Sequence, residues 1–171
     1  MKTQLKSFLS QSLIEMNDSN EGWLETYVRE YCHFIQQKLN VPVWKEYSYY
    51  SEDMYKLICQ WYNGEDISEE LLSFYIKLCR DVEEDCSKIV IQTIKKYRLP
   101  IKQRRYIQKT NSYLYFLSTV PFSRCLIPNN KLPNSIPQIV EQMPTTFQKN
   151  YDDFPDNFID LLRQYCYEIG E

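Results

Sequence analysis

The sequence contains no alanine in its 171 residues and only 3 glycines. Alanine is among the commonest residues of soluble domains, so a chain of this length normally carries on the order of a dozen. Helices here must therefore be built from larger residues, and close helix contacts must use Ser, Cys or Thr. Because Gly22, Gly64 and Gly170 are isolated from one another, a glycine-rich phosphate-binding loop is excluded.

Long apolar runs are also missing. No stretch approaches the roughly 18 apolar residues that a membrane-spanning helix needs, and the first ten residues lack the apolar core of a signal peptide. The six cysteines form no CxxC pair and no zinc-ligand spacing with the single histidine. We therefore expect a soluble intracellular protein with reduced core cysteines, no membrane contact, no metal and no cofactor.

Apolar side chains recur at helical spacing along most of the chain, which predicts an all-α fold. The expected helices cover residues 3–16, 21–39, 51–62, 69–97, 101–117 and 156–169. The clearest start is Ser68, a hydroxyl cap followed by two acidic residues, and no glycine or proline interrupts the pattern from there to residue 97. Residues 43–50 alternate loosely between apolar and polar side chains, and we expect them to be extended.

Prolines divide the chain into segments. Six of the 8 prolines lie between residues 121 and 155, which predicts an irregular stretch with one short helix near residues 138–142. We expect a helical domain at 1–117, a proline-rich extended segment at 118–155, and a C-terminal helix at 156–171 that packs on the same domain. The predicted architecture is an irregular bundle of about six helices with a long central helix at 69–97.

Charge is segregated along the sequence although the whole chain is net −3. Residues 1–85 are net −8, residues 86–151 are net +10 with Glu141 as their one acid, and residues 152–171 are net −5. Such asymmetry between parts of a chain points to an interaction surface. The predicted binding residues are Lys95, Lys96, Arg98, Lys102, Arg104, Arg105, Tyr106 and Lys109.

This basic block has several interpretations. Its cations suit phosphates, and interleaved tyrosines can stack on unpaired bases, although no recognisable nucleic-acid-binding module accompanies them. They equally suit an acidic protein, or the acidic segments of this same chain. If residues 101–117 form a helix, Lys102, Arg105 and Lys109 share one of its faces.

Candidates for catalysis are few. His33 follows Arg29 by four residues, a shorter gap than in the Arg–His motifs of helical ribonucleases, and we expect a half-buried, hydrogen-bonded histidine. Cys32 is adjacent to His33, but neighbours on a helix do not face each other. The acidic residues of the central helix are expected to be solvated, or to face the basic block. These residues are Asp81, Glu83, Glu84 and Asp85.

The leading functional hypothesis is a non-enzymatic helical interaction protein, a subunit or adaptor of a larger complex with a protein partner. It would use the basic–aromatic segment 95–115 and the extended segment 118–155 as contact surfaces. The alternatives are a nucleic-acid-binding protein that acts through residues 95–109, and an enzyme whose site is not recognisable. The abundant aromatic residues, 15 of them tyrosine, indicate either a loosely layered core or a partner-binding patch.

Overall fold

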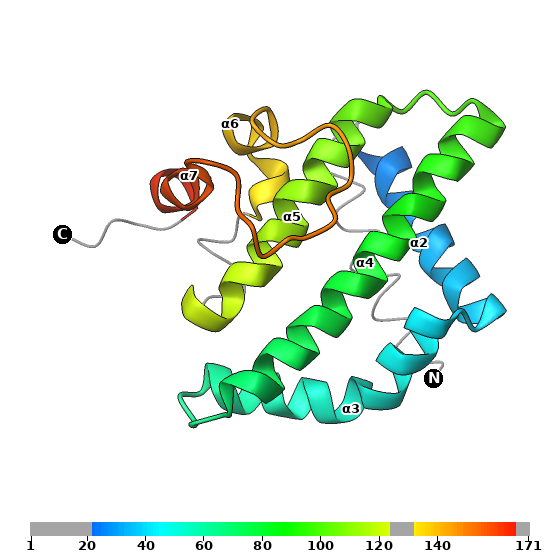
Figure 1. The fold of residues 1–171 in the computed structure, drawn as a ribbon. Coiled ribbons are helices and arrows are strands. Elements are labelled where there is room, and N and C mark those ends of the chain that lie inside the picture. Colours follow the sequence, from blue (N-terminus) through cyan, green and yellow to red (C-terminus); the bar gives the residue numbers. More distant parts are fainter. Residues whose placement is uncertain (1–21, 124–131, 167–171) are drawn as a thin grey trace.

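The computed structural model describes residues 22–123 and 132–166. Within these ranges the secondary structure is entirely helical, which confirms the all-α prediction (Figure 1). The elements are α2 (Trp23–Leu39), α3 (Pro42–Tyr62), α4 (Glu69–Tyr97), α5 (Gln103–Ser123), the short 3-10 turn η2 (Pro133–Ser135), α6 (Pro137–Val140) and α7 (Phe158–Tyr165). The predicted helix at 3–16 lies outside the described residues. None of the described helices is both long enough and apolar enough to cross a membrane.

Helix α4 is the axis of the fold. It has 29 residues, which corresponds to a length of about 43 Å, and its bounds match the predicted central helix. The Ser68 hydroxyl accepts a hydrogen bond from the Leu71 N–H, as the capping pattern predicts. Figure 1 shows α4 crossing the molecule, with α2 and α3 on one side and α5 on the other.

Two apolar clusters lie along α4. One joins the N-terminal half of α4 to α3, α5, α6 and α7, and Leu114, Ile139 and Phe158 are completely buried in it. The other joins the C-terminal half of α4 to α2 and to the start of α5, around Cys32, Cys86 and Val90. The long central helix is therefore shared by both parts of the core.

Two predicted boundaries were wrong. Residues 43–50 are not extended, because α3 begins at Pro42 and runs unbroken through them. Proline is well suited to the first turn of a helix, where its missing N–H has no intrahelical partner to lose. Helix α5 also continues beyond residue 117 to Ser123 and contains Pro121, so residues 118–123 belong to the helix and not to the extended segment.

The described part of the proline-rich segment wraps around α5. Asn111 on α5 donates its side-chain N–H groups to the carbonyl oxygens of Pro144 and Thr146, each at 2.8 Å. It also accepts a hydrogen bond from the Tyr151 hydroxyl at 2.7 Å. The Gln108 amide donates to the carbonyl of Met143. Backbone groups that irregular structure leaves unpaired are thus satisfied by two side chains of one helix.

Candidate functional site

The connection between α4 and α5 carries most of the predicted binding residues and lies at one end of the molecule (Figure 1). Helix α4 ends where Arg98 adopts a left-handed conformation with φ 51°, and the Arg98 N–H bonds to the Ile94 carbonyl. Ile101 is buried in the second apolar cluster and fixes the connection against the core. Lys95 and Lys96 occupy the last turn of α4, where the partial negative charge of the helix terminus favours cations.

Five of the eight predicted residues form one exposed cluster, which we call the cationic turn. Its members are Lys95, Lys96, Arg98, Lys102 and Arg104. Among the described residues, no carboxylate lies within ion-pair distance of any of them. The ring of Tyr97 is 60% exposed beside them, and the Lys96 Nζ lies 5.0 Å from its centroid.

The other three predicted residues are used within the fold. The Lys109 Nζ lies 2.6 Å from Glu25 Oε2 on α2, and the Arg105 guanidinium lies 3.5 Å from Glu141 Oε1. Tyr106 is buried in the second cluster, and this burial raises its pKa. The predicted face of Lys102, Arg105 and Lys109 therefore does not form a single free cationic surface.

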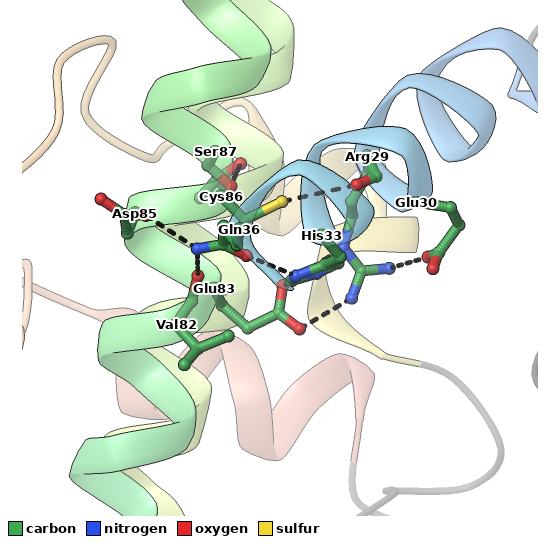
Figure 2. Close-up of polar contacts among 10 residues, drawn as sticks. Arg29, Glu30, His33, Gln36, Val82, Glu83, Asp85, Cys86 and Ser87 are labelled. Atoms are coloured by element: carbon green, nitrogen blue, oxygen red, sulfur yellow. Dashed lines mark hydrogen bonds and ion pairs between the residues drawn. The ribbon is translucent and has the colours of Figure 1, made fainter. Parts of the chain in front are cut away.

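A second polar feature was missed by the charge analysis, namely a network between α2 and α4 (Figure 2). The Arg29 guanidinium makes two hydrogen bonds to the Glu83 carboxylate, at 2.8 and 3.2 Å, and also lies 3.4 Å from Glu30. Cys86 donates its thiol hydrogen to the Arg29 carbonyl. The contacts of Arg29 with Glu83 and Cys86 join residues more than fifty positions apart and fix how the two helices cross.

His33 extends this network. It is hydrogen-bonded, as the sequence predicts, but it is buried and not half-buried. The Gln36 amide donates both of its N–H groups, to the Val82 carbonyl at 3.1 Å and to Asp85 at 2.8 Å. Its oxygen is therefore the acceptor for His33 Nδ1 at 2.8 Å, which places a proton on that nitrogen. The other ring nitrogen lies 3.6 Å from Glu83.

The acidic residues of α4 do not face the basic block. Glu83 belongs to the network with Arg29, whereas Asp81 and Glu84 pair with Lys77 and Lys88 of the same helix. Of the two expectations for this cluster, the one in which it faces residues 95–109 was wrong, and its four acidic residues are only partly exposed to solvent. Its carboxylates are oriented by partners four residues away on α4 and by α2.

The network makes the free energy of unfolding depend on pH. Burial alone would raise the pKa of Glu83, but Arg29 and His33 outweigh burial and hold this pKa at about 2. A lowered folded-state pKa contributes stability that is complete above the unfolded-state value of about 4.5 and is lost as the pH falls through about 2.

Glu83→Gln should therefore lower the free energy of unfolding by about 2 kcal/mol at neutral pH, since it leaves Arg29 with Glu30 alone. The difference between this variant and the wild type should shrink between about pH 4.5 and 2, as denaturant unfolding at a series of pH values would report. Glu84→Gln is the matched control, and it should cost about 0.5 kcal/mol at neutral pH because Glu84 makes only a pair along one helix. An equal acid dependence in the wild type and Glu83→Gln would contradict the assignment.

Cys32, Cys79 and Cys86 are free thiols with the character of core residues. Cys32, Cys86 and Cys166 have no exposed surface. Burial raises the pKa of Cys79 to about 11 and also raises the pKa of Cys86, so these thiols are protonated at neutral pH and are poor nucleophiles. Cys125 lies outside the described residues.

One open surface hollow, of about 640 Å³, lies beside the α2–α3 junction and is lined by Lys45, Glu46 and Tyr49 among others; neither His33 nor a cysteine lines it. Within the described ranges, no three His, Cys, Asp or Glu side chains are grouped to hold a metal ion. Comparisons with protein-family models, curated proteins and solved structures gave no match. The cationic turn is thus the candidate site that the geometry itself defines.

Proposed function

We propose that the protein is a non-enzymatic helical interaction protein, a subunit or adaptor of an intracellular complex, that binds an acidic protein partner through the cationic turn. This proposal rests on one observation: some of the eight predicted residues are used within the fold, and the others are exposed without a carboxylate partner. Arg105 and Lys109 pair with carboxylates of the fold, whereas the five cations of the turn have no such partner in the part of the chain described.

Physical chemistry supports an external partner for the turn. The five like charges at the α4–α5 connection and the adjoining helix ends repel one another. Nearby, Lys109 is neutralised by Glu25, so a cation of the same region that stabilises the fold has a carboxylate partner within the fold. An acidic surface would relieve this repulsion, accelerate association and orient the bound partner. The turn is also anchored by Ile101 and by two long helices, so little backbone entropy would be lost on binding.

Nucleic acid is a second candidate, and one observation favours it. The Tyr97 ring is 60% exposed next to Lys96, and an exposed aromatic ring among cations is a stacking platform for an unpaired base. Only one such ring lies in the cationic turn, because Tyr106 is buried. The acidic protein therefore remains the preferred partner.

Affinity capture from native extract at low salt tests both candidates. We expect one protein to be recovered in stoichiometric amount, to be released by about 0.5 M salt, and to be retained after nuclease treatment. Loss of the complex on nuclease treatment would show that the partner is a nucleic acid and not an acidic protein. Recovery of the bait alone, or of a partner that high salt does not release, would contradict binding through the cationic turn.

A further inference from the structure

Helix α2 presents aromatic side chains to solvent on the face opposite its buried residues. Trp23, Tyr27, Tyr31 and Phe34 are 43, 59, 47 and 49% exposed, and their steps of four, four and three residues align them along one side of the helix. Val28 and Cys32 face the core from the other side. We call these four side chains the aromatic stripe.

The stripe has the composition of a protein interface. Tryptophan and tyrosine are the residues most enriched at the centres of protein interfaces, because they bury large areas with few rotatable bonds. A half-exposed aromatic side chain offers on the order of 100 Å², so the stripe offers roughly 400 Å², which is the size of the largest apolar patch on a typical monomer, and such patches are often functional. No charged side chain interrupts it except at its margins, where Glu30 is already engaged with Arg29.

We propose that the aromatic stripe is a homodimer interface in which α2 packs antiparallel against α2 of a second copy. The spacing of the stripe favours this occupant, because positions 23, 27, 31 and 34 are nearly symmetric about their midpoint. An antiparallel pair therefore places Trp23 of one protomer opposite Phe34 of its partner, and Tyr27 opposite Tyr31 of the partner subunit. Each aromatic ring then contacts a ring of the other protomer, so the stripe is complementary to itself, as a two-fold interface requires.

Area and charge agree with a second copy. Two stripes would bury roughly 800 Å² of aromatic surface in total, and the side chains at their margins would add to this area, so the interface is at the small end of the size range for specific contacts. An uncharged stripe does not select the acidic partner expected at the cationic turn, but it accepts an identical stripe without bringing like charges together. The inference is independent of the proposed function, since none of the five cations of the turn is in the stripe.

Sedimentation equilibrium of the full chain tests the dimer. The wild type should dimerise between about 1 and 100 µM, and Tyr27→Arg/Tyr31→Arg should weaken association at least about 30-fold by placing like charges opposite one another. Tyr55→Arg/Tyr62→Arg is the matched control on α3, because these tyrosines are 71 and 65% exposed and lie outside the stripe. A wild type that is monomeric at 100 µM overturns the proposal, as does equal weakening by the control.

A second pair of variants tests the antiparallel register. Tyr27→Arg/Tyr31→Glu removes the same two rings as Tyr27→Arg/Tyr31→Arg, but antiparallel packing would set opposite charges against each other across the interface. It should therefore associate about tenfold more tightly than the double-arginine variant. Equal or weaker association of the Arg/Glu variant would overturn the antiparallel arrangement. Circular dichroism of each variant checks that the fold is intact, as expected for exposed positions.

Discussion

Phe158→Ala should lower the free energy of unfolding by about 4 kcal/mol and the melting temperature by about 10 °C. Phe158 opens α7 and has no exposed surface, so its removal leaves a cavity that the surrounding core fills only in part. Its ring lies 5.5 Å from that of Tyr115 on α5 and stacks on Phe154 at 5.9 Å between centroids. This cluster attaches the C-terminal helix to the main bundle.

Phe122→Ala is the matched control for this prediction. Phe122 is on α5 but is 73% exposed, so its loss should change the stability by less than about 0.5 kcal/mol. Thermal and denaturant unfolding of the two variants should each show a single transition if α7 belongs to the same cooperative unit. A Phe158→Ala protein that melts like the wild type would mean that α7 contributes nothing to the domain.

Reversing three charges of the cationic turn should reduce affinity for the acidic partner about 100-fold. In Arg98→Glu/Lys102→Glu/Arg104→Glu each reversal exchanges an attraction for a repulsion worth about 1 kcal/mol, and every 1.4 kcal/mol is tenfold in affinity. The same variant should unfold at the wild-type denaturant midpoint, since none of the three side chains pairs with a carboxylate in the described ranges.

Lys109→Glu should behave in the opposite way. It places a carboxylate against Glu25 between α5 and α2, and it should therefore cost stability while leaving the cationic turn intact. The comparison separates cations that hold the fold from cations available to a partner. Binding titrations with the captured partner and chemical denaturation measure the two effects. A large stability loss in the turn variant would contradict this separation.

How far the sequence predicts the structure is clearest in the helices. The bounds of α4 were predicted because a hydroxyl cap, acidic first-turn residues and the absence of proline all act locally. The start of α3 was misplaced at Ser51 because the loose alternation of residues 43–50 was interpreted as extended structure, whereas α3 begins at Pro42. Ser51 is inside α3 and its hydroxyl donates to the Ser48 carbonyl, so a residue type common at caps here satisfies its polar group within the helix.

The sequence predicted where the candidate site lies, but it did not predict which of the cations there are left without a carboxylate partner. The charge block located the α4–α5 connection, because sign and density of charge can be counted along a chain. Which cations remain free is decided by Glu25, 84 positions from Lys109, and by Glu141, and no local pattern reports such pairings. The aromatic stripe was not predicted either, because helical spacing places its four residues on a common face of α2 without showing which face of the helix packs on the core.

The most direct test of the proposed function is capture from one native extract with three baits in parallel. These are the wild type, the turn variant Arg98→Glu/Lys102→Glu/Arg104→Glu, and a control, Lys45→Glu/Lys56→Glu/Lys149→Glu, whose exposed lysines lie on α3 and after α6. Both variants change the net charge equally. We predict that the wild type and the control recover the same stoichiometric acidic protein and that the turn variant does not. Equal recovery by all three baits, or equal loss in both variants, would contradict a binding site at the cationic turn.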